Sequence, residues 1–214
     1  MPFGENFDLI LPKYLVNHDK ARLQDALKKF IPDGGNKRGE IDYTNFYKNS
    51  SQTVFLQSDL IKEIRYANWN NENSIYEKEY INAIIISNSC DISFQNEHSY
   101  NIKQCLFAPL IDFNEYLNTL KAKGHDAEKI SAASQTIKSQ LVSNILYLPN
   151  NENDNKEYIV LFDNIFWFPT IELNSYIEQM EENKISSLGL FGYYLFILKL
   201  SYHLCRLPDE YDNR

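Results

Sequence analysis

The residues with the clearest chemical potential form one polar cluster, Ser87-Asn88-Ser89-Cys90-Asp91. The cluster directly follows an apolar run, and polar groups that follow a buried strand sit on a loop held by rigid structure. The thiolate of Cys90 could act as a nucleophile if a histidine lay near it and the loop donated backbone N–H groups. Cys90 and Asp91 are therefore candidate catalytic residues, and Ser87 and Asn88 are candidate binding residues.

The same cluster also has a structural interpretation, which we favour. Asn88 and Asp91 would then hydrogen-bond to the backbone of a tight turn. Cys90 would be a small buried hydrophobic side chain, and buried structural cysteines are inert. The sequence leaves both interpretations open.

A second group of candidates lies near the carboxyl end of the chain. Lys199, His203 and Arg206 are spaced by four and three residues, so they share one face of a predicted helix. This basic stripe could contact a phosphate or an acidic partner, which makes Arg206 a candidate binding residue and His203 a candidate base for Cys90. The structural alternative, which we prefer, is that the helix dipole stabilises cations in the last turns, by about 0.3–1 kcal/mol each.

Two further patterns bear on binding. Arg65, Tyr66 and Trp69 combine a cation with aromatic rings and could stack a nucleic-acid base, but an exposed strand end beside a loop would have the same composition, and we favour that interpretation. None of the four histidines has a spacing typical of zinc ligands. We therefore expect neither a metal nor another cofactor.

Composition narrows the class of protein. A chain of 214 residues with 43% hydrophobic and 14% aromatic content can bury enough apolar surface to offset its ordering entropy. The net charge of -8 argues against a general nucleic-acid coat or a binder of anionic membranes. Cys90, Cys105 and Cys205 are odd in number and form no CxxC pair, which favours thiols in a reducing cytoplasm. The apolar run at 188–198 is about half the ~20 residues that span a bilayer, so we expect a cytoplasmic protein without a membrane segment.

Hydrophobic periodicity predicts alternating strands and helices. We expect strands at 53–66, 79–87, 102–111, 144–148 and 157–168, with the second of these buried on both faces. The irregular alternation of Ile61, Ile64 and Tyr66 indicates a bulge or a bend, and 67–74 has the composition of a loop. We expect helices at 19–30, 113–123, 126–141 and 187–206, with N-terminal caps at Asp126 and at Ser186 or Ser187.

These elements predict one globular domain over 1–214. Residues 1–50 form an N-terminal helical extension, 53–168 a barrel-like core with a helical insertion at 113–141, and 187–206 a C-terminal helix. The predicted core comprises Leu56, Ile61, Ile84, Ile85, Ile86, Leu106, Phe107, Ile145, Ile159, Leu161, Phe191, Leu195 and Leu198.

The order of these motifs resembles the SH3-like barrel of MazF/PemK-type toxins. Ile84-Ile85-Ile86-Ser87 stands where that family has a "VVLS"-like segment, and Phe107-Ala108-Pro109 stands where it has a "VAP"-like segment. The segment at 87–92, SNSCDI, also resembles a group of uncharacterised bacterial proteins with an S-x-x-C-D-I/L signature. The resemblance implies an α+β fold in which a bent SH3-like β-barrel or sheet carries an N-terminal helix and packed C-terminal helices. It also implies a homodimer.

The chain departs from the family at its catalytic positions. MazF-type ribonucleases have an arginine before the first of these strands and a threonine soon after the second. Tyr80-Ile81-Asn82 and Leu110-Ile111-Asp112 stand there instead, so no catalytic residue can be transferred. We expect a non-catalytic bacterial binding or accessory protein, in a phage-defence or mobile-element setting, with a protein or an RNA as partner.

Two alternatives keep open whether the chain is an enzyme. The first is an endoribonuclease with a non-standard active site around Cys90, Asp91 and Arg206. The second is a cysteine-dependent hydrolase with Cys90 as its nucleophile.

Overall fold

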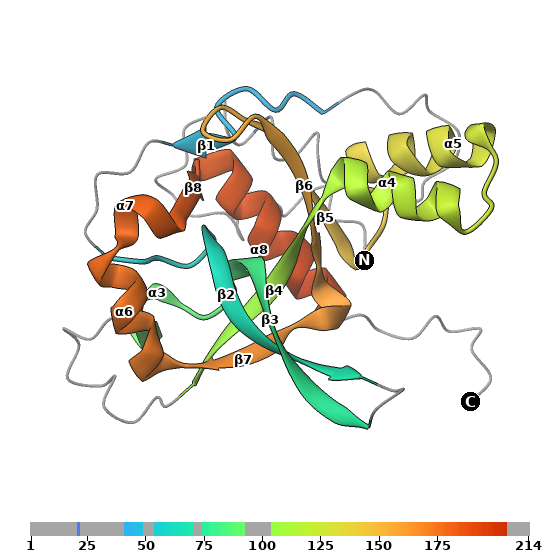
Figure 1. The fold of residues 1–214 in the computed structure, drawn as a ribbon. Helices are drawn as coiled ribbons and strands as arrows, with labels where there is room; N and C mark the ends of the chain where they lie inside the picture. The colour runs from blue at the N-terminus through green and yellow to red at the C-terminus, as the bar shows by residue number, and fades with distance from the viewer. Residues whose placement is uncertain (1–20, 22–40, 49–53, 71–73, 93–103, 205–214) are drawn as a thin grey trace, which may run out of the picture.

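One curled antiparallel sheet organises the fold, with helices packed against it (Figure 1). The computed structural model describes residues 21, 41–48, 54–70, 74–92 and 104–204. The strand order is β1-β8-β2-β3-β4-β6-β5, and β7 also pairs with β4. The predicted class, an α+β fold with a bent β-barrel or sheet and packed helices, is confirmed. The predicted helix at 19–30 lies outside the described residues apart from Ala21.

The strands are β1 Tyr47–Lys48, β2 Asp59–Asn70, β3 Ile75–Ile85, β4 Gln104–Asp112, β5 Ile145–Asn151, β6 Lys156–Leu161, β7 Phe166–Pro169 and β8 Lys184–Leu188. The helices are α3 Ser89–Ile92, α4 Phe113–Ala122, α5 Ala127–Lys138, α6 Leu173–Glu178, α7 Met180–Asn183 and α8 Leu190–Leu204. Two short 3₁₀ helices, η2 Phe162–Asn164 and η3 Thr170–Glu172, flank β7. None of the described helices is long and apolar enough to cross a membrane.

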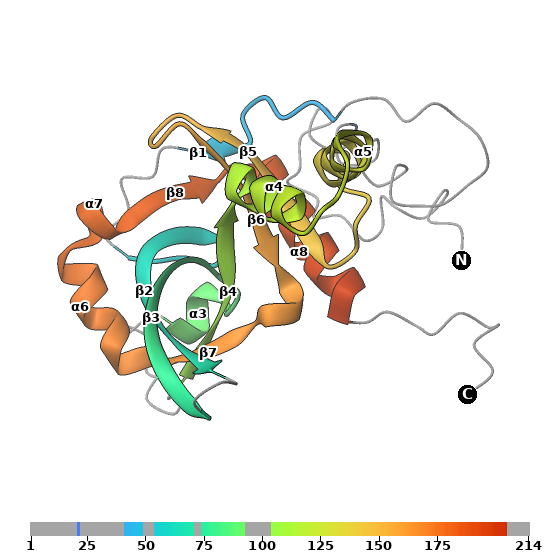
Figure 2. The same ribbon diagram turned by 45° about the vertical axis from the view of Figure 1, so that its right-hand side comes forward.

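The sheet separates two main cores. We call the cluster inside the curl the barrel core and the cluster that includes α8 the helix core; α3 lies inside the curl (Figure 2). The barrel core comprises Phe55, Ile61, Ile64, Ala83, Ile85, Ile92, Cys105, Phe107, Phe168 and Leu173. The helix core includes Phe46, Leu60, Ile84, Ile86, Ala108, Leu146, Val160, Phe191, Leu195 and Phe196.

The apolar run at 83–86, which comprises the end of β3 and the residue after it, is buried on both faces, as the sequence predicts. Ala83 and Ile85 belong to the barrel core, whereas Ile84 and Ile86 belong to the helix core. Successive side chains of a strand point to opposite faces, so an unbroken apolar run supplies both cores. Fully burying one isoleucine stabilises a fold by about 1.5–3 kcal/mol.

The hairpin formed by β2 and β3 is longer than expected. The predicted bulge is confirmed, because the pairing register shifts between Ile61 and Ile64 and Glu63 has a φ of 52°. The predicted loop at 67–74 is wrong over much of its length, because β2 continues to Asn70. Strand β4 pairs with β3 over residues 83–85, so the distal part of the hairpin extends beyond the sheet (Figure 1). We call this part, residues 64–70 and 75–81, the ribbon.

The strand predicted at 157–168 is wrong as a single element. Strand β6 ends at Leu161, η2 turns the chain, and β7 follows. Strand β6 pairs with β4 over residues 110–112, whereas β7 pairs with it over 104–107. Phe162 is buried in the turn between them. Strand β4 therefore pairs with β6 along one part of its length and with β7 along another, and the chain has to turn between β6 and β7.

The C-terminal helix begins at Leu190 rather than at 187, and the predicted caps Ser186 and Ser187 lie in β8. The Ser187 hydroxyl donates to Asp59, so it is not available to the helix. Gly189 instead donates its backbone N–H to the Phe46 carbonyl at 2.8 Å. Long-range bonds therefore decide where this helix begins.

The two helices predicted at 113–123 and 126–141 are confirmed as α4 and α5. Asp126 caps α5 by accepting from the Lys129 N–H at 2.8 Å, as expected. Gly124 follows α4 with a φ of 86°, a conformation that favours glycine. The two helices stand out from the rest of the molecule (Figure 1).

Most predicted core residues are buried, but Leu106 is not. Its side chain is 43% exposed because it points away from Cys105 and Phe107, which fill the barrel core. Leu56, Leu161 and Leu198 are half-buried. The confirmed set comprises Ile61, Ile84, Ile85, Ile86, Phe107, Ile145, Ile159, Phe191 and Leu195.

Candidate functional site

The polar cluster that follows β3 is bonded to the residues that precede β2. The Ser89 hydroxyl oxygen accepts from the Gln57 backbone N–H at 2.9 Å. The Gln57 side chain donates to the Ile86 carbonyl at 2.7 Å and accepts from the Tyr193 hydroxyl at 2.9 Å. The cluster therefore joins β2, β3 and α8, and its polar atoms hold backbone segments together.

Ser87 and Asn88 have similar structural roles. The Ser87 hydroxyl oxygen accepts from the Leu106 N–H at 2.8 Å. The Asn88 carbonyl accepts from the Asp91 N–H at 3.0 Å, which starts the single turn of α3. Cys90 is exposed on this turn, so the prediction of a buried cysteine is wrong. Its catalytic role, and that of Asp91, stays a prediction.

The structure does not bring His203 to Cys90. His203 lies at the end of α8, with Nε2 3.7 Å from an Asp163 carboxylate oxygen. Its ring packs 5.8 Å from the Phe162 ring. The end of α8 and α3 lie apart in both views (Figures 1 and 2). Arg206 lies outside the described residues.

Lys199 is not part of a surface stripe. Its side chain is 2% exposed, and Nζ donates to Gln140 Oε1 at 3.0 Å and to the Ile145 carbonyl. Burial lowers the pKa of Lys199 well below its ordinary value. The prediction of a surface stripe is therefore wrong for this residue, because α8 turns it toward β5 and away from solvent.

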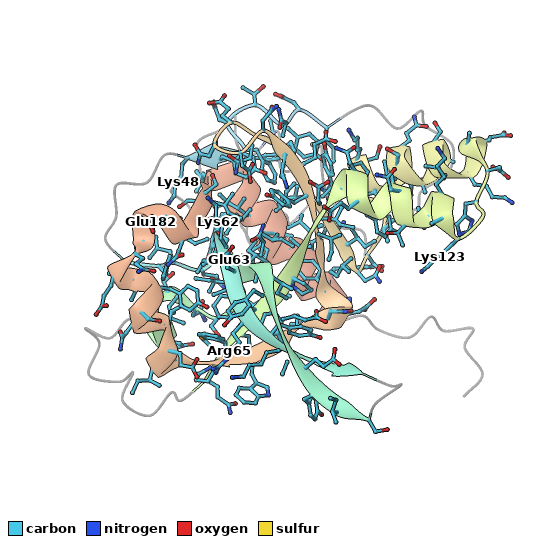
Figure 3. All side chains as sticks on the ribbon, viewed as in Figure 1. Lys48, Lys62, Glu63, Arg65, Lys123 and Glu182 are labelled. Atoms are coloured by element: carbon cyan, nitrogen blue, oxygen red, sulfur yellow. The ribbon has the colours of Figure 1, made fainter. Side chains whose placement is uncertain are left out.

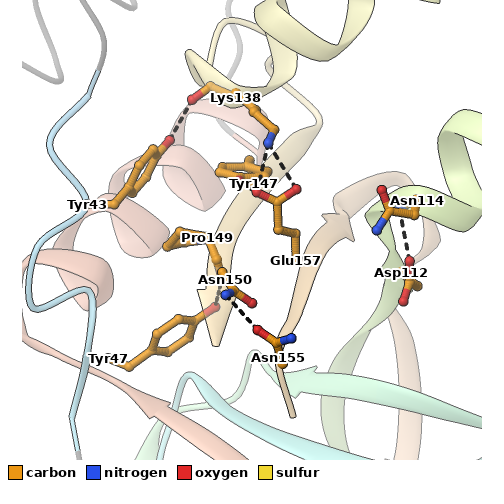
Figure 4. A network of polar contacts seen from close by, with 10 residues as sticks. All are labelled: Tyr43, Tyr47, Asp112, Asn114, Lys138, Tyr147, Pro149, Asn150, Asn155 and Glu157. Atoms are coloured by element: carbon orange, nitrogen blue, oxygen red, sulfur yellow. Dashed lines mark hydrogen bonds and ion pairs between the residues drawn. The ribbon is translucent and has the colours of Figure 1, made fainter. Parts of the chain in front are cut away.

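A second polar network surrounds β5 and β6 (Figure 4). Lys138 Nζ donates to both carboxylate oxygens of Glu157, at 2.7 and 2.9 Å, and the Tyr147 hydroxyl donates to the same carboxylate at 2.5 Å. The Tyr43 hydroxyl donates to the Lys138 carbonyl, and the Tyr47 hydroxyl reaches the Pro149 carbonyl, both at 2.7 Å. Burial is the main cause that raises the pKa of Tyr43 and Tyr47, so both phenols are neutral donors. This network attaches residues 41–48 to α5 and to β5.

A buried ion pair joins β2 to β8. Asp59, 1% exposed, accepts from Lys184 Nζ and from the Ser187 hydroxyl, both at 2.7 Å. Serine, aspartate and lysine can support nucleophilic chemistry, but Ser187 is also 1% exposed and so cannot reach a substrate. The pair is not apparent from the sequence, because its members are more than 120 positions apart in the chain.

Exposed aromatic and cationic side chains gather on one face of the ribbon. Arg65 pairs with Tyr80, and Ala67 pairs with Lys78. Residues opposite each other in an antiparallel pair share a face, and the face repeats every second residue. Arg65, Tyr76, Lys78 and Tyr80 therefore share one face, which we call the ribbon face. Tyr76 is 72% exposed and Tyr80 is 67% exposed.

The carboxylates of the ribbon lie on its opposite face. Glu77 and Glu79 alternate with the ribbon-face residues and share their side with Tyr66, which is paired with Glu79. The Tyr66 ring contacts the Phe166 ring edge-on at 4.9 Å. The ribbon therefore separates its charges: cations accompany the exposed rings, and carboxylates face the other way.

The base-stacking interpretation of Arg65, Tyr66 and Trp69, which the sequence favoured less than an exposed strand end, does not hold for the first two residues. Arg65 and Tyr66 lie on opposite faces, and the side chain of Trp69 lies outside what the structure describes. Arg65 forms a 2.5 Å ion pair with Glu172 of η3, which places it beside β7 and α6 (Figure 3). The neighbours that join Arg65 come from β3. An alternating Tyr-x-Lys-x-Tyr pattern at 76–80 was the signal that could have revealed them.

The sequence matches no protein-family model and no curated protein.

Proposed function

We propose that this protein is a non-catalytic binding protein that presents the ribbon face to its partner. One observation carries the proposal: the strand register gathers Tyr76, Tyr80, Lys78 and Arg65 on one face and sends both neighbouring glutamates to the other. Tyrosine rings supply large contact area with a polar end, and tyrosine and arginine are enriched where binding energy concentrates.

The ribbon is held in place, which favours binding. The Tyr176 hydroxyl of α6 donates to the Glu63 carbonyl at 2.9 Å. The Arg65–Glu172 ion pair and the Tyr66–Phe166 ring contact attach the ribbon to η3 and β7. A surface fixed before binding loses less conformational entropy when a partner arrives.

The groups with catalytic potential support a structural role. Ser87 and Ser89 accept backbone N–H groups, Ser187 and Asp59 are buried together, and His203 lies beside Asp163. A base within hydrogen-bond reach is one way to activate a nucleophile, and the end of α8, which carries His203, lies apart from α3, which carries Cys90 (Figures 1 and 2).

Affinity capture tests the proposal. Tagged wild type and a Tyr76→Ala/Tyr80→Ala variant are incubated with extract of the organism that encodes the protein, and the recovered proteins and nucleic acids are identified. We expect a partner that wild type retains and the variant loses. A Glu77→Ala/Glu79→Ala variant, altered on the opposite face, should retain it.

Two results would contradict the proposal. Equal recovery by all three proteins would exclude the ribbon face as the binding surface. Cleavage of an RNA panel by the purified protein, abolished by Cys90→Ala, would show an enzyme instead of a binding protein.

A further inference from the structure

We infer that the ribbon face binds a single-stranded nucleic acid, with bases stacked on Tyr76 and Tyr80 and a backbone phosphate held by Lys78 between them. The inference rests on the proposed function and names the class of ligand. It is drawn from the order of side chains along one exposed strand face: ring, cation, ring.

The spacing of the rings favours a single strand over a duplex. Tyr76 and Tyr80 are four residues apart on β3, about 13 Å at 3.3 Å per residue. Neighbouring bases in a duplex strand are about 3.4 Å apart, so two stacked neighbours cannot each cover one ring. Bases that are splayed out can do so, and aromatic side chains recognise unstacked bases in this way.

The charges on and around the ribbon face predict that electrostatic attraction contributes weakly to binding and that base stacking contributes substantially. Lys78 is exposed between the rings, whereas Arg65 is already paired with Glu172. The chain carries a net charge of -8, which opposes a polyanion in general. Glu77 and Glu79 lie on the opposite face of the ribbon. A phosphate that approaches the ribbon face would therefore contact Lys78 without passing these carboxylates. Stacking tolerates any base sequence, because every base has a π-face.

Fluorescence anisotropy with labelled decamers tests the inference. The probes are oligo-rU, oligo-dT, a DNA duplex and a polyglutamate peptide, at low salt. We expect the two single strands to bind more tightly than the duplex and the peptide. Equal affinity for oligo-rU and oligo-dT would show that bases and phosphates are recognised in either sugar context, whereas tighter oligo-rU binding would identify RNA as the source of the ligand.

Substitutions separate the two kinds of contact. Tyr76→Ala and Tyr80→Ala should each weaken binding by about five- to 150-fold, whereas Tyr76→Phe and Tyr80→Phe should retain most of it. Lys78→Gln should reduce the slope of log affinity against log salt by about 0.7, the value for one phosphate on a single strand. Both tyrosines are exposed, so we expect their substitution to leave the thermal unfolding curve unchanged. That curve is the check that the variants are folded.

A gain of binding offers a stricter test. Glu172→Gln removes the negative charge that neutralises Arg65, while the glutamine amide oxygen can still accept its hydrogen bond and keep the ribbon attached to η3. Affinity for the single strands should rise by up to about fivefold. Glu77→Gln changes the net charge by the same amount on the opposite face and should leave affinity close to that of wild type.

Several results would overturn the inference. These are no binding to either single strand at low salt, duplex binding as tight as single-strand binding, or binding that both alanine variants retain. Tighter ribbon-dependent binding of the peptide would point to a protein partner instead. In each case, ribbon-dependent capture from extract would leave the proposed function standing without this ligand.

Discussion

Gly192 of α8 lies directly against the backbone of Phe46: a Cβ placed on Gly192 would be 2.6 Å from the Phe46 carbonyl oxygen. Gly189 makes the same approach, with a built Cβ 2.6 Å from the Asn45 carbonyl oxygen. The segment before β1 therefore packs against Gly192 of α8 and against Gly189, the residue that precedes the helix, and a larger side chain does not fit at either position. Helix propensity alone predicts the opposite preference, because alanine is about 1 kcal/mol better than glycine inside a helix.

We expect Gly192→Ala to lower the free energy of unfolding by about 1–3 kcal/mol. The added methyl group would overlap the Phe46 carbonyl, so the backbone of one of the two segments would have to shift. Urea denaturation measures the change. Ser201→Ala, at an exposed position of the same helix, should be neutral or slightly stabilising. A Gly192→Ala variant as stable as wild type would contradict the close approach.

Asp59→Asn should lower the free energy of unfolding by about 3–5 kcal/mol, because it leaves the Lys184 ammonium without its buried partner. The loss is read from the urea midpoint at constant slope. Lys129→Ala breaks the exposed pair with Asp126 and should cost under about 1 kcal/mol. Similar losses in the two variants would show that the Asp59 pair is not buried in solution.

Lys199 should make stability depend on pH. Its folded pKa is lowered by burial, so the unfolded state binds more protons between that lowered pKa and the ordinary value of 10.5. Stability therefore rises with pH within this window and falls as pH decreases through it, by up to about 1.4 kcal/mol per pH unit.

Lys199→Met removes this contribution. The difference in unfolding free energy, wild type minus variant, should rise between pH 7 and pH 9 in urea titrations. Lys121→Met, at an exposed position, should show a difference that stays constant with pH. A constant difference for Lys199→Met as well would mean that the buried amine does not titrate as the structure requires.

Cys90 and Cys105 should react very differently with iodoacetamide. Cys90 is exposed, whereas Cys105 is buried and its pKa is raised to about 11 by burial. At pH 7.5, in a Cys205→Ser background, we expect Cys90 to be labelled in the native protein and Cys105 only after unfolding. Mass spectrometry of the peptides identifies each site.

The rate at Cys90 also tests the hydrolase alternative. A rate equal to that of a short unstructured peptide thiol would mean that no neighbouring group activates it. A much faster rate would revive Cys90 as a nucleophile and weaken the proposal of a non-catalytic protein.

Local signals in the sequence predicted much of the fold. The caps at Asp126 and Gly124 depend on neighbouring residues, and the apolar run at 83–86 predicts a strand buried on both faces by itself. The bulge near Ile64 was visible as a break in alternation. In each case, the deciding interaction lies within a few residues.

Features that depend on pairing could not be predicted in the same way. The break between β6 and β7 depends on the pairing of both strands with β4. The start of α8 depends on the hydrogen bond that the Ser187 hydroxyl donates to Asp59. Lys199 looked like a surface cation because the sequence does not show which face of the helix packs inward. The alternation of Tyr76, Lys78 and Tyr80 could be seen in the sequence, but the register of β2 and β3 was needed to place Arg65 on the same face.

The placement of the two cores on neighbouring residues has a consequence for cooperativity. Phe107 belongs to the barrel core and Ala108 to the helix core, and Ile85 and Ile84 divide in the same way. Because adjacent residues of one strand belong to different cores, a strand that loses its packing in one core also loses its position in the other. The two cores therefore melt together, and calorimetry should record one transition, with a calorimetric enthalpy equal to the van't Hoff value.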